Sequence, residues 1–261
     1  MSQYHAIANL TRRQGYSPSG VGTHLQLIGI MGSETALAPT LIALAGDWKG
    51  DRIAIVGDYA EDGDLPDEAM TGIATPHAVW PEIVGGSSTW INIEAAARAM
   101  LVDSGRATFK RTPTGWYHVA EVHPRADLGE YVIVNLDARQ KLTPTLLGDH
   151  PDLGVFALTG YYGGTITAMA VLLAVSNGRG GGDFRHGHPL VGSWGGHRLA
   201  ALPAAEAEDY EDITATMRDV LTAGHEAKFV VSDDGTVRRY VDPWEAEATK
   251  LLDIDALVAA V

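Results

Sequence analysis

The chain has 261 residues, of which 46% are hydrophobic and 20% are charged, and its formal net charge is −14. This composition is typical of folded globular proteins, and the negative charge without a basic stripe argues against nucleic-acid binding. The sequence contains no cysteine, which excludes disulfides, thiolate nucleophiles and cysteine-ligated zinc and fits a cytoplasmic protein. The longest apolar run, Ala168–Val175, is too short to span a bilayer, so we expect no membrane association.

Strands are expected where β-branched and apolar residues precede turn signals, and helices where stretches rich in Ala and Leu reach helical length. The first half reads as a strand, a helix, a strand, a helix and a hairpin, at Tyr4–Leu10, Thr35–Ala45, Arg52–Asp58, Ile93–Ser104, Ala107–Thr112 and Trp116–Val122. The second half reads in the same order, at Tyr131–Leu136, Thr165–Ser176, Arg198–Leu202, Tyr210–Ala223, Lys228–Ser232 and Thr236–Val241. Beyond it, Asp242 and Pro243 are typical of a helix start and predict a C-terminal helix over residues 243–261.

Five sequence blocks recur in the same order in the two halves, which is the clearest pattern in the chain. For example, Asn-Leu-x-x-Arg-Gln occurs at residues 9–14 and 135–140, and Trp-x-Gly-x-Arg occurs at 48–52 and 194–198. The pattern predicts an α+β fold built by tandem duplication of a β-α-β-α-β-β unit. We expect residues 1–125 and 126–242 to be the two repeats, with extra residues at 62–93 in the first and 176–191 in the second.

The repeated Trp-x-Gly-x-Arg block supplies the first candidate site, formed by Trp48, Arg52, Trp194 and Arg198. Arginine recognises carboxylates and phosphates through a planar fork of donors, and tryptophan can stack on a planar group. These residues would therefore contact a small anionic ligand. The alternative is structural, with each tryptophan filling the core and each glycine making a turn.

A second candidate site is a metal site formed by Asp183, His186, His188 and His197. Imidazole and carboxylate groups are ligands of zinc and other divalent metals, although His-x-His in a loop is also common without a metal. The preceding Asn-Gly-Arg-Gly-Gly-Gly stretch, residues 177–182, could cradle an anion or simply connect two elements. An acidic run over residues 58–68 reads as a solvated loop, because the spacing of a calcium loop fails in it.

Residues 47–60, Asp-Trp-Lys-Gly-Asp-Arg-Ile-Ala-Ile-Val-Gly-Asp-Tyr-Ala, resemble a stretch in a family of uncharacterised bacterial and phage proteins. Members of that family carry Trp-x-Gly-Asp-Arg-Ile…Gly-Asp-Tyr, often after an Arg-Gly-Gly-Gly-Asp loop. This chain has Arg-Gly-Gly-Gly-Asp at 179–183, ahead of its second tryptophan block, and the strand after that block lacks Gly-Asp-Tyr. The resemblance implies an association with phage or mobile elements and no particular activity.

Taken together, these patterns favour a non-catalytic binding or interaction protein without a cofactor. Its ligand would be a protein partner or a small anionic molecule, held in a pseudo-symmetric groove between the repeats. A metal-dependent hydrolase that uses a divalent metal at the Asp183 and histidine region is the first alternative. The second alternative is a structural or assembly protein that forms homo-oligomers through its C-terminal helix.

Overall fold

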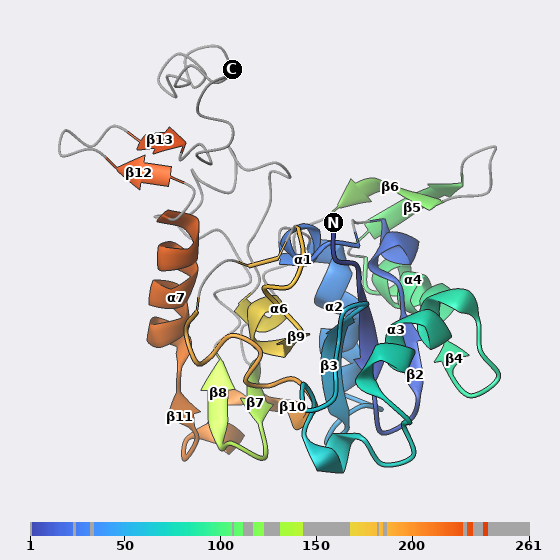
Figure 1. The fold of residues 1–261 in the computed structure, drawn as a ribbon, viewed down its shortest axis with the longest axis horizontal. Coiled ribbons are helices and arrows are strands. Elements are labelled where there is room, and N and C mark those ends of the chain that lie inside the picture. The colour runs from blue at the N-terminus through green and yellow to red at the C-terminus, as the bar shows by residue number, and fades with distance from the viewer. Residues whose placement is uncertain are drawn as a thin grey trace.

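The computed structural model of the protein describes residues 2–22, 25–31, 34–105, 107–111, 117–122, 131–142, 168–181, 183–184, 187–226, 229–231 and 237–239. Within these residues, helices surround a mixed β-sheet, so the fold is α+β as predicted (Figure 1). No described helix is both long enough and apolar enough to cross a membrane. The expected helix at 243–261 lies outside the described residues.

One nine-stranded sheet contains strands from both halves of the chain. Eight of its strands follow the order β11-β8-β7-β10-β3-β1-β2-β4, and β9 pairs with β3. The first half supplies β1 (His5–Asn9), β2 (Gln14–Tyr16), β3 (Arg52–Gly57) and β4 (Ile91–Asn92). The second half supplies β7 (Tyr131–Asn135), β8 (Gln140–Leu142), β9 (Ala174–Val175), β10 (His197–Pro203) and β11 (Glu211–Asp212).

The remaining described elements are helices, short 3-10 turns and two separate hairpins. The helices are α1 (Leu27–Met31), α2 (Glu34–Leu44), α3 (Pro76–Gly85), α4 (Glu94–Asp103), α6 (Ala168–Leu173) and α7 (Thr214–Glu226). The 3-10 turns are η1 (Pro18–Val21), η2 (Asp67–Ala69) and η4 (Ala204–Ala207). The hairpins pair β5 (Ala107–Arg111) with β6 (Tyr117–Val122) and β12 (Phe229–Val231) with β13 (Val237–Arg239). Most expected elements overlap these, but residues 174–175, expected at the end of a helix, form strand β9. The sequence patterns do not predict α1, α3 or the short strands β2, β4, β8 and β11.

After Arg52, strand β3 is apolar and buried, because both of its faces are covered. Ile53 and Ile55 pack into the large core that contains α2, α4 and α6, whereas Ala54 and Val56 pack on the other face with residues of α3. A strand buried on both faces needs a continuous apolar run instead of an alternating one. The Ile-Ala-Ile-Val sequence of β3 follows from this position in the middle of the molecule.

The recurring sequence blocks occupy matched positions on the two sides of the β3–β10 pair. The indole nitrogen of Trp48 donates to Gln14 Oε1 (3.1 Å), and that of Trp194 donates to Gln140 Oε1 (3.0 Å). The glycine of each block has a left-handed backbone, with φ of 85° at Gly50 and 79° at Gly196. Each block therefore makes the same turn, in which glycine avoids the strain that a Cβ would cause.

The two stretches of extra residues both pack against β3. In the first half, residues 62–93 contain α3, which lies over one face of β1 and β3. In the second half, the extra residues begin at Ser176, directly after β9, and a Cβ on Gly57 of β3 would lie 2.5 Å from Ser176 Oγ. Both segments therefore lie near the C-terminal end of β3, at Gly57.

Candidate functional site

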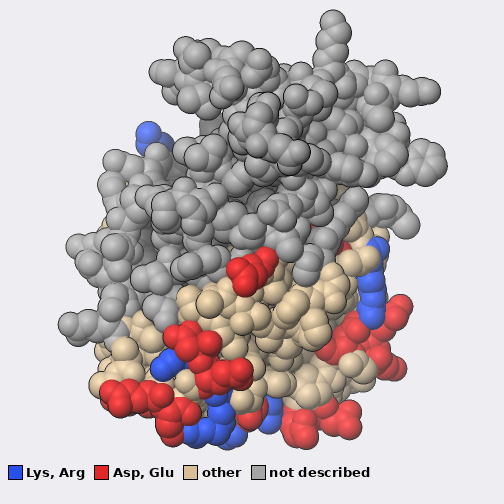
Figure 2. Space-filling model, turned by 90° about the vertical axis from the view of Figure 1, so that its left-hand side faces the viewer, with Lys and Arg blue, Asp and Glu red and all other residues tan. Residues whose placement is uncertain are grey.

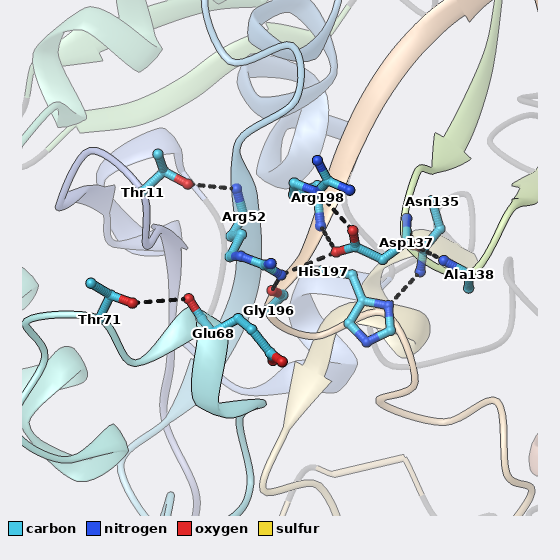
Figure 3. Close-up of polar contacts among 10 residues, drawn as sticks. All are labelled: Thr11, Arg52, Glu68, Thr71, Asn135, Asp137, Ala138, Gly196, His197 and Arg198. Atoms are coloured by element: carbon cyan, nitrogen blue, oxygen red, sulfur yellow. Dashed lines mark hydrogen bonds and ion pairs between the residues drawn. The ribbon is translucent and has the colours of Figure 1, made fainter.

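The two arginines of the repeated block face each other across the centre of the sheet. In the antiparallel pair of β10 and β3, Arg198 is directly opposite Arg52. Both guanidinium groups donate to one carboxylate, since Arg52 Nη1 lies 3.0 Å from Asp137 Oδ2 and Arg198 Nε lies 2.7 Å from Asp137 Oδ1 (Figure 3). The side chains of Arg52 and Asp137 are 20% and 22% exposed and that of Arg198 is 52% exposed, so this cluster reaches the surface.

A tight turn after β7 presents Asp137 to the arginines. Asn135 Oδ1 accepts the backbone N–H groups of Asp137 (3.0 Å) and Ala138 (2.9 Å), and Arg139 has φ of 55°. Burial by itself would raise the pKa of Asp137. Hydrogen bonds from the backbone and side chain of Arg198, with the charges of Arg198 and Arg52, outweigh it and hold the pKa below its usual value. Asp137 is therefore an ionised carboxylate at neutral pH.

The two tryptophans of the predicted anion site are core residues. Trp48 is 3% exposed and Trp194 is 0% exposed, and both indole N–H groups already donate to glutamines. Neither ring presents a face on which a ligand could stack. For the tryptophans, the structural interpretation of the repeat therefore applies, and only the arginines of this set reach the surface.

Among the candidate metal ligands that the structure describes, Asp183, His188 and His197 do not form a group that could hold a metal ion. His188 Nδ1 accepts the N–H of Leu190 (3.2 Å), and His197 Nδ1 lies 2.9 Å from the amide nitrogen of Asn135. Asp183 is buried elsewhere, as described below, and His186 lies outside the described residues. Across the described ranges, no three His, Asp or Glu side chains form a group that could hold a metal ion.

The glycine-rich stretch is an anion cradle that the chain fills with its own carboxylate. The backbone N–H groups of Gly178 and Gly180 each donate to Asp183 Oδ2 at 2.9 Å. Asn177 closes the loop, because its side chain both donates to and accepts from the backbone of Phe184, at 2.8 Å each. Successive backbone amides that point inward favour an anion. Here that anion is Asp183, which is 3% exposed.

Asp183 belongs to a buried polar cluster at the C-terminal end of β3, together with His5, Gln3 and Ser176. With its amide turned so that the nitrogen faces Asp183, Gln3 donates to Asp183 Oδ2 (2.7 Å) and accepts from Ser176 Oγ (2.5 Å). His5 is 0% exposed, and neither ring nitrogen has a hydrogen-bond partner in the part of the chain that the structure describes. Burial lowers the pKa of His5 to about 4, so its ring is neutral at pH 7.

The pKa of Asp183 is raised, mainly by burial. Hydrogen bonds from the backbone of Gly180, Gly178 and Arg179 oppose this rise, and the negative charge of Asp58 adds to it. The sequence patterns do not single out His5 or Gln3. A histidine inside an otherwise apolar strand is the one local signal that could have drawn attention to this cluster.

Arg179 ties the glycine-rich loop to the acidic loop after β3. Its guanidinium makes a two-pronged ion pair with Asp64, at 2.5 Å to Oδ2 and 2.7 Å to Oδ1, and donates to the carbonyl of Tyr59 (2.7 Å). Glu61 lies 3.6 Å away. The Arg-Gly-Gly-Gly-Asp and Gly-Asp-Tyr motifs, far apart in sequence, therefore meet at one end of β3. This junction of the two motifs is the candidate functional site.

A pocket of about 770 Å³ opens beside this junction. It is lined by Asp58, Tyr59, Ala60, Glu61, Asp62, Thr75 and His77. The lining comes from the acidic loop and from the start of α3, where Thr75 caps the helix by accepting the N–H of Ala78 (3.3 Å). One oxygen of Asp58 accepts the N–H of Tyr4 (3.1 Å). This bond anchors the carboxylate to the residue that precedes β1.

The charged residues in the lining of this pocket are all acidic. It contains three carboxylates and no lysine or arginine. On the face seen in Figure 2, by contrast, Lys and Arg side chains lie beside Asp and Glu. Comparisons of the whole chain with protein-family models, with curated proteins and with solved structures find no match.

Proposed function

We propose that this protein is a non-catalytic binding protein that holds a positively charged organic group in the pocket beside Asp58. The observation that supports the proposal is the lining of the pocket, with the carboxylates of Asp58, Glu61 and Asp62 and no cationic side chain. Like charges gathered around one concave surface raise the local concentration of an oppositely charged ligand. The sequence favours an anionic ligand, and the pocket favours a cationic one.

An organic cation fits the pocket better than a bare metal ion. Among the described residues, no three His, Asp or Glu side chains form a group that could hold a metal ion. A molecule with separate amino or guanidino groups can reach them one at a time. The volume of about 770 Å³ also lies within the range of pockets that take small molecules, roughly 300–1,000 Å³.

The acidic loop already binds one guanidinium, that of Arg179. Asp64 holds it in the two-pronged geometry that carboxylates and guanidinium groups favour, and the carbonyl of Tyr59 accepts from it as well. This contact supports a ligand that carries a guanidinium or an amine. His5 and Asp183, which are 0% and 3% exposed, are buried away from this pocket and do not line it.

Titration calorimetry with agmatine, which carries one guanidinium and one amine, tests the proposal. The variants Asp58→Asn and Asp62→Asn should each weaken binding by about tenfold or more, because each removes a charge without changing the shape of the side chain. Glu206→Gln is the matched control, since Glu206 is exposed and lies outside the pocket. Binding of agmatine that is equal in all four proteins would refute the proposal.

The tandem duplication is part of the same proposal. Its support is the set of matched contacts, such as Leu10 N to Arg52 O (2.8 Å) and Leu136 N to Arg198 O (2.9 Å). Strand order is also the same when read outward from β3 and from β10. In this view the duplicated unit supplies the scaffold, and the pocket forms between the loop that follows β3 and the start of α3.

Three further expectations rest on the sequence. These are the cytoplasmic location, the association with phage or mobile elements, and the division into repeats at residues 125 and 126. A metal-dependent hydrolase would depend on His186, and assembly through the C-terminal helix would depend on residues 243–261, and both lie outside the described residues.

A further inference from the structure

The end of β3 opposite the pocket carries a second charged cluster, formed by Arg52, Asp137 and Arg198. We infer that this cluster is an oxyanion-binding site that the chain occupies with its own carboxylate, and that it takes a carboxylate or phosphate group of a ligand. The two ends of β3 are about 17 Å apart, because the strand is six residues long. The inference is therefore independent of the pocket and of the function proposed for it.

The first argument is the balance of charge. Two guanidinium groups share the single negative charge of Asp137, which leaves one positive charge on the cluster. Buried or partly buried ionic groups are stable when their charges are matched. A further anion would complete this balance.

The second argument is the number of hydrogen-bond donors that remain. Arg198 uses its Nε on Asp137, and within the described ranges its two Nη groups make no hydrogen bond. Arg52 uses Nη1 on Asp137 and on the carbonyl of Gly196, at 3.0 Å each. The side chain of Arg198 is 52% exposed, so its free donors are open to a ligand.

The third argument comes from the other half of the chain. The backbone N–H of Arg198 donates to Asp137 Oδ2 (2.9 Å), and the backbone N–H of Arg52 donates to Thr11 Oγ1 (2.9 Å). Thr11 and Asp137 hold matched positions in the two turns. Since a neutral hydroxyl completes the turn in the first half, the fold does not require a carboxylate at this position. The negative charge of Asp137 therefore compensates the positive charges of the two arginines, as a bound oxyanion would.

The test is the variant Asp137→Asn, which keeps an oxygen for the N–H of Arg198 and removes the charge. Inorganic phosphate and malonate are titrated separately at low ionic strength, because salt screens such contacts. We expect Asp137→Asn to bind at least one of them about tenfold more tightly than the unmodified protein, and Asp137→Asn with Arg198→Gln to lose this gain. Tighter binding of malonate alone indicates a carboxylate ligand, and tighter binding of phosphate alone indicates a phosphate ligand. Either result supports the site, and so does tighter binding of both anions.

Two controls keep the result specific. Asp209→Asn removes the carboxylate of the neighbouring Arg139–Asp209 ion pair and should leave the binding of both anions unchanged. Thermal unfolding of each variant shows that it is folded. The inference is overturned if folded Asp137→Asn binds neither anion more tightly, or if Asp209→Asn gains as much. The pocket variant Asp58→Asn should not alter anion binding, so the two proposals fail separately.

Discussion

Nε2 of His5 lies 3.9 Å from Oδ1 of Asp183, and these side chains are 0% and 1% exposed. The two residues are far apart in sequence and come from a strand of the first half and a loop of the second. An imidazole without hydrogen bonds in such a place is costly, because a buried polar group loses its water without gaining a partner. The pair therefore makes the folded state sensitive to pH.

The free energy of unfolding should decrease as the pH is lowered from about 6.5 to about 4. Burial lowers the pKa of His5 from 6.5 to about 4, and the backbone of Leu25 offsets this effect only in part. In this window the unfolded chain binds a proton on His5 that the folded chain does not bind. The stabilisation is complete above pH 6.5 and is lost as the pH approaches 4, by at most about 3 kcal/mol.

Urea unfolding of the unmodified protein and of His5→Phe at a series of pH values measures this effect. The variant cannot titrate at position 5, so its free energy of unfolding should depend less steeply on pH. His77→Phe changes an exposed histidine in the same way and should keep the original slope. Parallel curves for the unmodified protein and His5→Phe would contradict the assignment to His5.

Arg179 competes with any cation for the acidic loop. Its guanidinium holds Asp64 and lies 3.6 Å from Glu61. Arg179→Gln should release both carboxylates and raise the affinity for agmatine, by roughly three- to tenfold. Arg179→Lys keeps the charge without the two-pronged geometry and should have a smaller effect. A weaker affinity in Arg179→Gln would mean that Arg179 shapes the pocket instead of competing for it.

The tryptophans should affect stability and leave anion binding unchanged. Trp194→Phe removes the hydrogen bond to Gln140 and part of a fully buried ring, which should cost about 1–3 kcal/mol. Trp48→Phe should cost a similar amount because its contact with Gln14 is equivalent. Chemical unfolding measures both costs. Anion binding is tested with each tryptophan variant combined with Asp137→Asn. If a folded variant lost phosphate or malonate binding, the tryptophans would be part of the anion-binding site after all.

The matched glycines should differ in their tolerance of alanine. Gly50 and Gly196 have nearly the same φ, so Gly→Ala carries a similar backbone strain of about 1 kcal/mol at each. A Cβ at Gly196 would lie 2.8 Å from Cδ of Pro66, whereas one at Gly50 would meet nothing within 4 Å. Gly196→Ala should therefore be more destabilising by a further 1–3 kcal/mol, roughly the cost of overpacking. Equal melting temperatures for the two variants would contradict this difference.

Local chemistry in the sequence was enough to predict most of the described elements. The Ile-Ala-Ile-Val run of β3, the apolar periodicity of α4 and the turn residues of the β5–β6 hairpin act within a few residues of each other. The sequence also placed the recurring blocks and identified residues 62–93 and 176–191 as the segments in which the halves differ. These inferences need no knowledge of which elements become neighbours.

Tertiary structure decided everything that depends on distant pairing. The register of β3 and β10 set Arg198 opposite Arg52, and the fold of the glycine loop decided that its anion is Asp183. The acidic run, expected to be a solvated loop, keeps Glu61 and Asp62 exposed, and its Asp64 also pairs with Arg179. The physical reason is that the sequence specifies which polar and charged groups need a hydrogen-bond or ion-pair partner. Which partner each group finds is decided only when the sheet brings separate segments within hydrogen-bond distance.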